Sequence, residues 1–517
     1  MTLRELLAAV QTRAPFDTAP MSAASGSVSS AAATAVTSVT SDSRTVAPGS
    51  VFVALRGLKA DGAAFARDAV ARGAIAVVGE TPAPADASVT WIQVADARLA
   101  LAALAAAFFE SPSDRLVLVG ITGTNGKTTT SYLLASVFEA AGIKCGRIGT
   151  VGYHDGTREV AATRTTPESP EIQRMLCDML AAGCGACVME VSSHALALRR
   201  ADYLHFSAAI FTNLTRDHLD FHRNMDDYAA AKRRLFELLP AGGIGVVNAD
   251  DRRGAAFAAA APRPVTYAID APADVRPGPL SLSLDGLAFD VRTPRGTLAL
   301  RSPLVGRPNT YNILAAVAAA MALDLPFNAI ERGIAALAQV PGRFQLVSDP
   351  ADDVRVVVDY AHTDDALKNL LETARPLAAA RVITVFGCGG DRDRTKRSLM
   401  GAVAARLSDL VVITSDNPRS EDPEEIIEEI KRGIVMPADR VPPKGQAGPK
   451  ATPFLAIVDR KTAIERAIQE ARAGDLVLVA GKGHEKYQEI GGRVLPFDDV
   501  EVARGALAKR RSRSRVS

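Results

Sequence analysis

The stretch LVLVGITGTNGKTTTSYLLASVFEAAG, residues 116–142, decides the fold of this chain. Its apolar run LVLVG has the character of a buried strand, and a glycine-rich turn and a helical pattern follow it. Glycines let backbone N–H groups approach phosphate oxygens, Lys127 supplies a cation, and the Thr128 hydroxyl can bind Mg²⁺. A strict phosphate-loop pattern requires glycine at position 121, where this chain has Ile121. The order of strand, Gly-Lys-Thr and helix still favours a nucleotide phosphate loop over a chance turn, and by itself indicates only an NTPase.

Strand-like and helical segments alternate on both sides of this loop. Downstream, the runs CVMEV, AAIFTNL and GVVNAD are separated by helical stretches, which predicts a mostly parallel sheet with helices on both faces. Upstream, VFVAL, AIAVVG and WIQV alternate with alanine-rich stretches and predict a small α/β domain. Near the C-terminus, VRVVVDY, VITVFG, LVVITSD and LVLVAG predict a further, Rossmann-like α/β domain.

We therefore predict an α/β protein with three domains. At 517 residues the chain is too long for one ordinary core. The predicted boundaries are 1–112 for the N-terminal domain, 113–340 for the central phosphate-loop domain and 341–517 for the C-terminal domain. The segments 17–38 and 437–453 are interpreted as loops. The opening MTLRELLAAVQTRAPF suits an amphipathic helix better than a signal peptide, because charges interrupt its apolar run.

Composition argues against several classes of protein. The chain is 48% hydrophobic and 23% charged with a net charge of +2, which gives no strong tendency toward nucleic acid, membranes or acidic partners. No apolar stretch approaches the length of a membrane span. Five cysteines are few and odd in number, which is typical of a reducing compartment, so we predict a cytoplasmic protein. We interpret Cys184 and Cys187 as buried structural thiols, and the basic tail 509–515 as a solvated, frayed terminus rather than a polyanion site.

Polar residues that could carry chemistry follow the predicted strands. Glu190 ends the run CVMEV, where its carboxylate can face the phosphate loop and hold Mg²⁺; a buried ion pair is the alternative. His218 follows AAIFTNL and is a candidate ligand of a second divalent ion. Lys232, in YAAAKRRLF, on its own indicates a solvated basic face. The C-terminal strands end in AHTDD, CGGDRDR, NPRSEDP and KGHEKYQ, which predicts a second site there, because ligands bind beyond the carboxyl ends of parallel strands.

Taken in order and spacing, GITGTNGKTTT, NLTRDHLDFH and YAAAKRRLF resemble the Mur ligases, the ATP-dependent enzymes that build the stem peptide of peptidoglycan. The blocks SDSR, TTPE, EVSSH, DYAH, DNPR and GKGHE resemble those members that add a diamino acid. The resemblance implies a monomeric ligase without nucleic-acid or membrane partners. Its substrates would be ATP, meso-2,6-diaminopimelate and UDP-N-acetylmuramoyl-L-alanyl-D-glutamate, joined through an acyl phosphate with release of ADP and phosphate.

The resemblance also implies roles for the residues in the matching motifs. UDP would be bound in the N-terminal domain by Ser41, Ser43, Leu58, Lys59 and Ala60. ATP would be bound by Gly123, Thr124, Asn125, Gly126, Lys127, Thr128, Thr129, Asn312 and Asp359. The muramoyl dipeptide would be held by Thr165, Thr166, Ser192 and Arg200. The diamino acid would be bound by Arg392, Asp416, Asn417, Pro418, Arg419, Gly481 and Glu485. Catalysis would depend on Lys127, Glu190, His218 and Lys232. Two Mg²⁺ ions would be held by Thr128, Glu190, His218 and a carbamylated Lys232.

Four positions depart from the usual pattern of the family. Arg164 stands where asparagine is common, Leu198 where glutamine is frequent, Pro308 where an aromatic residue or histidine is usual, and Asp364 where proline is usual. Two alternatives to this ligase remain. A folylpolyglutamate synthase-like ligase shares the phosphate loop, but the SDSR and DNPR blocks argue against it. A phosphate-loop switch NTPase would leave the Arg, Asp and Asn clusters of the C-terminal domain without a purpose.

Overall fold

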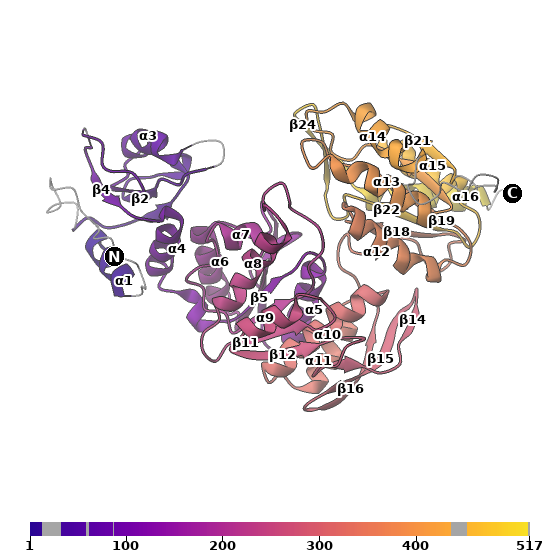
Figure 1. Cartoon of the computed structure of the whole chain (residues 1–517), viewed down its shortest axis with the longest axis horizontal. Coiled ribbons are helices and arrows are strands. Elements are labelled where there is room, and N and C mark those ends of the chain that lie inside the picture. Colours follow the sequence, from indigo (N-terminus) through magenta and orange to yellow (C-terminus); the bar gives the residue numbers. More distant parts are fainter. Residues whose placement is uncertain (13–32, 58–60, 86, 436–451, 515–517) are drawn as a thin grey trace.

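The computed structural model describes residues 1–12, 33–57, 61–85, 87–435 and 452–514. These residues form three α/β domains that follow one another along the long axis of the molecule (Figure 1). The predicted fold class is thereby confirmed. The predicted loops 17–38 and 437–453 lie largely outside the described residues, and Leu58, Lys59 and Ala60 lie wholly outside them.

The N-terminal domain is built on a parallel sheet with the strand order β1-β2-β3-β4. Its strands are β1 (Ser38–Thr40), β2 (Ser50–Val53), β3 (Ala76–Gly79) and β4 (Thr90–Gln93). Three of them are formed by the predicted runs VFVAL, AIAVVG and WIQV. One face of the sheet packs against the helices α1 (Leu3–Thr12) and α4 (Ala97–Phe108), and the other against α3 (Ala66–Ala71). The predicted N-terminal helix is therefore present, and its side chains Leu3, Leu6 and Val10 are buried.

The central domain contains a sheet with the strand order β12-β11-β10-β5-β9-β6-β7-β8. The parallel strands are β5 (Val117–Thr122), β6 (Cys145–Ile148), β9 (Ala186–Glu190), β10 (Ala208–Phe211), β11 (Ile244–Asn248) and β12 (Arg263–Tyr267). The sheet continues antiparallel through β7 (Gly152–His154) and β8 (Glu159–Ala161). Because β5 lies between β9 and β10, the residues that follow these three strands meet at one edge of the sheet.

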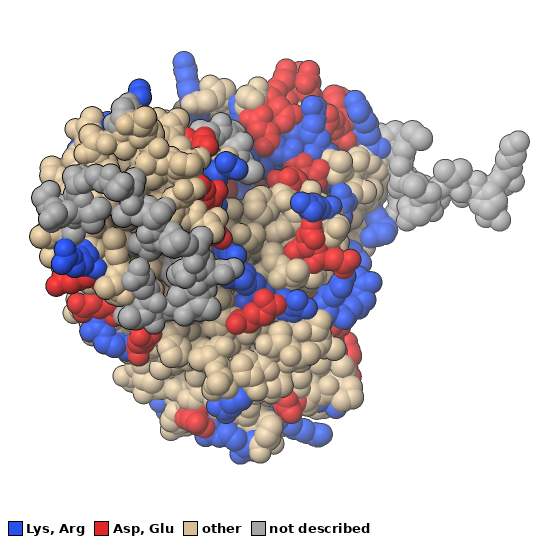
Figure 2. All heavy atoms as spheres, turned by 60° about the vertical axis from the view of Figure 1, so that its left-hand side comes forward, with Lys and Arg blue, Asp and Glu red and all other residues tan. Residues whose placement is uncertain are grey.

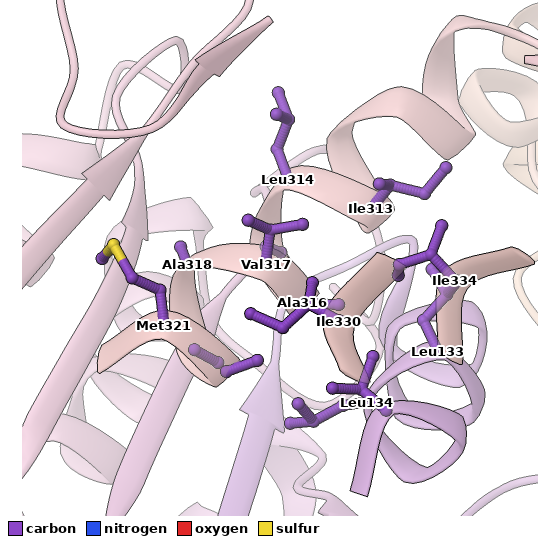
Figure 3. Packing of buried hydrophobic residues seen from close by; sticks show 14 of the residues in the cluster. Leu133, Leu134, Ile313, Leu314, Ala316, Val317, Ala318, Met321, Ile330 and Ile334 are labelled. Carbon is purple, nitrogen blue, oxygen red and sulfur yellow. The ribbon is translucent and has the colours of Figure 1, made fainter. Parts of the chain in front are cut away.

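Helices cover both faces of this sheet, as predicted. One face packs against α5 (Lys127–Ala140), α10 (Arg307–Ala322) and α11 (Phe327–Ala336). The opposite face packs against α6 (Ser169–Ala181), α8 (Met225–Glu237) and α9 (Gly254–Ala260), with the short α7 (Ser193–Ala197) beside them. Figure 3 shows Leu133 and Leu134 of α5 among side chains of α10 and α11. This packing holds α5, and with it the end of the phosphate loop, against the sheet.

An antiparallel sheet in the central domain was not predicted. Its strands are β13 (Arg276–Pro277), β14 (Ser281–Ser283), β15 (Gly286–Thr293) and β16 (Gly296–Ser302), in the order β13-β15-β14 with β16 paired to β15. Along β16, buried and exposed side chains alternate, so only one face of the sheet is covered. Such strands contain no continuous apolar run. Continuous apolar runs in the sequence therefore do not indicate these strands.

The C-terminal domain has a sheet with the strand order β17-β18-β22-β19-β20-β21. Its strands are β17 (Gln345–Leu346), β18 (Arg355–Asp359), β19 (Val382–Phe386), β20 (Leu410–Ile413), β21 (Phe454–Ala456) and β22 (Leu476–Ala480). All pairings except that of β17 are parallel. One face packs against α12 (Asp364–Ala374), α13 (Thr395–Leu407) and α14 (Pro423–Val435), and the other against α15 (Arg460–Glu470) and α16 (Asp499–Ser514). A hairpin of β23 (Tyr487–Ile490) and β24 (Arg493–Pro496) follows β22.

The basic tail differs from the prediction. Residues 509–514 continue helix α16 instead of fraying. Arg510 forms an ion pair with Asp353 at 2.6 Å, and Arg511 forms ion pairs with Asp349 at 2.7 Å and Asp352 at 2.5 Å. The terminal cations are therefore used to attach α16 to the acidic segment that precedes β18, which sequence spacing alone could not show.

The state of the cysteines and the distribution of surface charge both agree with what the composition predicts. The five cysteines all lie within the described residues and are free thiols, and Cys184 and Cys187 are buried, as predicted. On the face drawn in Figure 2, basic and acidic side chains are interspersed. Among the described residues, no helix is long and apolar enough to span a membrane.

Candidate active site

The phosphate loop connects β5 to α5, and its glycines permit a close approach of neighbouring residues. Gly123 and Gly126 have φ angles of 146° and 89°, in the region that favours glycine. A Cβ atom on Gly126 would lie 2.4 Å from Oδ1 of Asn312. The Lys127 ammonium donates hydrogen bonds to the carbonyls of Gly123 and Thr124, both at 2.9 Å. Burial lowers the pKa of Lys127, while the charges of Glu190 and Asp217 act in the opposite direction.

The Glu190 carboxylate lies beside this loop, because Glu190 of β9 pairs in register with Ile121 of β5. It is 1% exposed and accepts hydrogen bonds from the Thr128 hydroxyl at 3.1 Å and from the Thr150 hydroxyl and backbone N–H at 3.0 and 2.9 Å. Within the described ranges, Glu190 forms no ion pair with a basic side chain. The alternative interpretation as a buried ion pair is therefore not supported.

Lys232 is buried, although its basic neighbours in the sequence indicated an exposed position. It is 1% exposed, so the interpretation as a solvated basic face is wrong. Its amino group donates a hydrogen bond to the Gly123 carbonyl at 2.7 Å and lies 4.6 Å from the centre of the Tyr228 ring. Burial lowers the pKa of Lys232 far below its usual value, and the nearby Lys127 lowers it further. Both effects favour the neutral amine over the ammonium.

His218 lies on the wall of the same cavity as Thr128 and Glu190. Its backbone is left-handed, with φ at 55°, and its N–H donates to the Asp217 carboxylate at 2.8 Å. Burial lowers the pKa of His218 to about 4, so the imidazole is neutral and can act as a ligand. Burial opposes ionisation of Asp217, but His218 and His362 hold its pKa below the usual value.

The residues around this cavity fit a magnesium site only in part. Hydroxyl and carboxylate oxygens of Thr128 and Glu190 are the ligand types that Mg²⁺ prefers, and they are already in contact. An unmodified amine at Lys232 is not such a ligand. Among the described residues, no group of three or more His, Cys, Asp and Glu side chains is placed to hold a metal ion. The predicted metal site thus depends on a further ligand, which a carbamate on Lys232 would supply.

The residues predicted to hold the dipeptide gather next to Glu190. The Thr166 hydroxyl donates to the Glu190 carbonyl at 2.9 Å, and the Thr165 hydroxyl lies 3.1 Å from that of Thr150. The Ser192 side chain caps α7. Arg200 donates to the Thr166 carbonyl at 3.1 Å. Among the departures from the family pattern, Arg164 pairs with Glu168 at 2.6 Å, and Leu198 ends α7.

The predicted nucleotide-binding residues, with the exception of Gly123, line two adjoining cavities between the central and C-terminal domains. Asn312 and Pro308 line both cavities. Asp359 accepts backbone hydrogen bonds from Phe344 at 2.7 Å and Ala361 at 2.8 Å, and burial raises the pKa of Asp359. Asp364 stands in the first turn of α12, where a carboxylate is favourable near the helix N-terminus. This position explains how an acidic residue replaces the usual proline.

The residues predicted to bind the diamino acid line a third cavity of about 570 Å³. It contains Arg392, Asp416, Asn417, Arg419, Gly481 and Glu485, whereas Pro418 does not line it. Arg419 has a left-handed backbone with φ at 54°, and its guanidinium donates to Glu489 at 3.1 Å and to the Gly390 carbonyl at 2.8 Å. The third cavity shares Asp217 and His218 with the phosphate-loop cavity, so the two sites adjoin.

Several residues at these cavities were not predicted. They are Thr150, Asp217, Arg343, Tyr360, His362, Lys396 and Lys482. Arg343 donates to the Thr128 hydroxyl at 3.1 Å, and Lys482 contacts Glu485 at 2.9 Å. Asp217, Tyr360, His362 and Lys482 stand within the motifs NLTRDHLDFH, DYAH and GKGHE, so the signal was present in the sequence. Thr150 follows β6 without such a motif. Ser41 and Ser43, in the N-terminal domain, do not line any of these three cavities.

Comparison with known proteins gives consistent matches along the chain. Residues 35–109 match the model of the Mur ligase family catalytic domain, residues 121–320 that of the Mur ligase middle domain, and residues 342–483 that of the Mur ligase glutamate ligase domain. The UDP-N-acetylmuramoyl-L-alanyl-D-glutamate–2,6-diaminopimelate ligase of Solibacter usitatus is 50% identical over 92% of this chain and 94% of its own. The enzyme of the same name from Geobacter metallireducens is 48% identical over 90% and 93%.

Solved structures show the same fold. One, of a UDP-N-acetylmuramoyl-L-alanyl-D-glutamate–2,6-diaminopimelate ligase, has 35% identity and a TM-score of 0.64 over 92% of this chain and 95% of its own. The folylpolyglutamate synthase of Mycobacterium tuberculosis has a TM-score of 0.60 at 16% identity, over 79% and 95%, so it shares the fold alone. With its phosphate loop, its three domains and relatives that share up to half of its residues, the chain belongs to the Mur ligase family and is an ATP-dependent amide ligase.

Proposed function

We propose that this chain joins meso-2,6-diaminopimelate to the D-glutamate of UDP-N-acetylmuramoyl-L-alanyl-D-glutamate in peptidoglycan synthesis. The observation that carries the proposal is the shared wall of the phosphate-loop cavity and the third cavity, formed by Asp217, His218, Tyr360, His362 and Thr363. An amine bound in one cavity can thus meet a carboxylate activated in the other. The names of the relatives at 50% and 48% identity support the same reaction.

The chemistry requires activation of the carboxylate before the amide can form. A carboxylate does not acylate an amine unaided, so ATP first phosphorylates the side-chain carboxylate of D-glutamate and ADP leaves. The amine then attacks the acyl phosphate, loses a proton and releases phosphate. No protein nucleophile is needed, because the site acts by positioning the reactants and neutralising charge. Lys127 supplies a cation to the phosphates from the end of the loop.

A neutral amine at Lys232 suits the proposed carbamate. Carbon dioxide reacts with a neutral amine and not with an ammonium, and burial shifts Lys232 toward the neutral form by lowering its pKa. Thr128, Glu190, His218 and the carbamylated Lys232 would hold two Mg²⁺ ions. When bound, the ions would neutralise charge on the transferring phosphoryl group.

The remaining assignments follow from the same proposal. Domain 1–112 would bind UDP with Ser41 and Ser43, domain 113–340 would bind ATP and the dipeptide, and domain 341–517 would bind the diamino acid. Arg392 and Arg419 would meet the carboxylates of the diamino acid, and Glu485 would meet an ammonium group. A monomer acting in the cytoplasm fits these substrates.

Release of phosphate tests the proposal directly. We expect phosphate release only when ATP, the UDP-muramoyl dipeptide and diaminopimelate are all present, with one amide formed for each phosphate released. A switch NTPase would hydrolyse ATP without either of the other substrates, and a folylpolyglutamate synthase-like ligase would require a folate. The Lys127→Ala variant serves as control: it should lose ligation and keep a near-normal thermal unfolding midpoint. Wild-type turnover in that variant would refute the phosphate-loop assignment.

A further inference from the structure

Lys482 is a buried cation beneath the third cavity to which neither the comparisons nor the sequence analysis assigns a role. It follows β22 and stands between Gly481 and Gly483, whose φ angles of 116° and 56° turn the chain there. Its side chain is 0% exposed. Its ammonium donates hydrogen bonds to Oδ1 of Asn417 and to Oε2 of Glu485, both at 2.9 Å. Because a buried charge requires partners, these two bonds fix where the ammonium lies.

The ammonium also fixes the orientation of the Asn417 amide. Oδ1 of Asn417 accepts from Lys482 and from the Glu489 N–H at 3.0 Å, while Nδ2 donates to Oε2 of Glu485 at 2.9 Å. Lysine and the backbone N–H can only donate, and an ionised carboxylate can only accept. Rotation of the amide by 180° would set donor against donor and acceptor against acceptor. Asn417 therefore has one orientation in this network, and Lys482 supplies one of the two donors that hold its Oδ1 in place.

The same contacts orient the Glu485 carboxylate. Its Oε2 receives two hydrogen bonds, one from Lys482 and one from Asn417. For Oε1, no hydrogen bond from another described residue is found, and Glu485 lines the third cavity. The network thus holds one oxygen and leaves the other for a ligand. A substrate ammonium in the cavity is the complementary group.

The network extends from Lys482 to Arg419, which lines the same cavity. Glu489, whose N–H donates to Asn417, accepts a hydrogen bond from Nε of Arg419 at 3.1 Å through its side chain. The Arg419 N–H in turn donates to the Glu489 carbonyl at 3.0 Å. A displacement of Asn417 would therefore affect both Glu485, which can bind a cation, and Arg419, which can bind an anion.

We propose that Lys482 is a positioning residue for the diamino acid, which acts by fixing Asn417 and Glu485 in the arrangement that receives the substrate's charged groups. This inference rests on the proposed function. It assigns to Lys482 no contact with substrate and no part in the transfer of the phosphoryl group. Loss of Lys482 should therefore change the binding of one substrate of the three.

The experiment compares the KM values of the three substrates in Lys482→Met. We expect the KM for diaminopimelate to rise about tenfold to a hundredfold, the range for a lost hydrogen bond to a charged group. The KM values for ATP and the UDP-muramoyl dipeptide should stay within about twofold of wild type. A merely structural role would raise all three KM values together, or none, and either outcome would overturn the proposal.

A double substitution tests whether Lys482 acts through Glu485. If it does, Lys482→Met should raise the KM for diaminopimelate by a clearly smaller factor in a Glu485→Gln background than in wild type, because the carboxylate to be oriented is already gone and only the effect through Asn417 remains. An equal fold-increase in the KM for diaminopimelate in both backgrounds would contradict the inference. This comparison also decides the matter if Lys482→Met alone fails to fold, since the double variant removes both charges of the pair.

Arg381→Met is the matched control. It removes a cation from Asp475, which is 1% exposed and directly precedes β22, at the opposite end of the strand from Lys482. We expect a lower thermal unfolding midpoint and unchanged KM values. Wild-type turnover separates a failure of the proposed function from a failure of the role assigned to Lys482. Absence of diaminopimelate-dependent phosphate release in wild type would refute the proposed function, whereas normal wild-type turnover with an unchanged KM in Lys482→Met would refute only the role of Lys482.

Discussion

Lys232 is a residue whose chemistry is set by burial. Burial lowers the pKa of Lys232 and so favours the neutral amine that carbamylation requires, and only the carbamate could bind Mg²⁺. We predict that Lys232→Ala is nearly inactive and that added formate or acetate restores part of the activity by taking the place of the carbamate. Ligation assays with increasing carboxylate measure this rescue.

Two substitutions are controls for the Lys232 prediction. Arg233→Ala changes the neighbouring cation, which pairs with Glu237 at 3.1 Å on the exposed side of α8, and should leave activity unchanged. Lys232→Arg keeps a permanent cation in the pocket and should be inactive without rescue. A fully active enzyme with an unmodified amine at Lys232 would show that the carbamate is not needed.

Arg419 is the residue on which selection of the diamino acid depends in the proposed function. Diaminopimelate carries a second carboxylate that lysine lacks, and a guanidinium can bind it with two parallel N–H donors. Arg419→Ala should reduce kcat/KM for diaminopimelate about tenfold to a hundredfold, because a hydrogen bond to a charged group is lost. Lysine should be a poor substrate of wild type and should lose much less in the variant.

Steady-state assays with both amino acids measure the Arg419 prediction. Arg419→Lys is the matched control, since it keeps the charge and loses the two-donor geometry; it should fall between wild type and the alanine variant. Equal use of lysine and diaminopimelate by wild type, or equal losses for both in Arg419→Ala, would contradict the assigned specificity without affecting the ligase assignment.

At the scale of the elements, continuous apolar runs predicted the strands that are buried on both faces. Runs such as LVLVG and LVLVAG form β5 and β22, which are central in their sheets. Strands β15 and β16 were not predicted because one of their faces is exposed, and all three residues of β14 are exposed. The burial of Lys232 could have been predicted. The buried residues of α8 are Tyr228, Ala229, Lys232, Leu235 and Phe236, a helical spacing that places Lys232 on the apolar face.

Contacts between distant segments could not be predicted from these patterns. Thr150 reaches Glu190 because β6 pairs with β9, and no local feature of the sequence records that pairing. The same holds for α16, whose cations meet an acidic segment more than a hundred residues earlier in the chain. The periodicity of apolar residues predicts which residues lie on one face of a helix or strand. Which helices and strands contribute residues to one site depends on how the strands pair in the sheet.

Helix α16 gives a prediction about stability. Hydrogen bonding from Arg510 lowers the pKa of Asp353, so this contact stabilises the folded state above the unfolded pKa of an aspartate, about 4, and the stabilisation is lost as pH falls through the lower folded value. Arg510→Ala with Arg511→Ala should therefore lower the thermal unfolding midpoint at pH 7, and the difference from wild type should shrink toward pH 3. Arg504→Ala, an exposed position of the same helix, is the control. An unchanged midpoint at pH 7 would show that the ion pairs do not stabilise the domain.

At the scale of the whole molecule, the C-terminal domain contacts the central domain around the phosphate loop. Each has its own core, and polar contacts connect them around the phosphate loop. Asn125 donates to Asp365 at 3.2 Å, and Arg216 donates to Thr395 at 3.0 Å. Individual polar contacts of this kind between domains permit relative motion. The cavities that they border are those where ATP and the diamino acid are proposed to bind.

We predict that the C-terminal domain closes over the central domain when the substrates bind. A nucleotide held between the phosphate loop and α12 would contact both domains, so binding favours the arrangement in which they are closest. Small-angle scattering should show a smaller radius of gyration with a non-hydrolysable ATP analogue and the UDP-muramoyl dipeptide than without ligands. Lys127→Ala, which should bind the nucleotide weakly, is the control and should show less compaction at the same concentrations. Identical scattering of wild type with and without saturating ligands would show that the described arrangement is already the reactive one, and that reactants meet across the shared wall of Asp217 and His218 without domain movement.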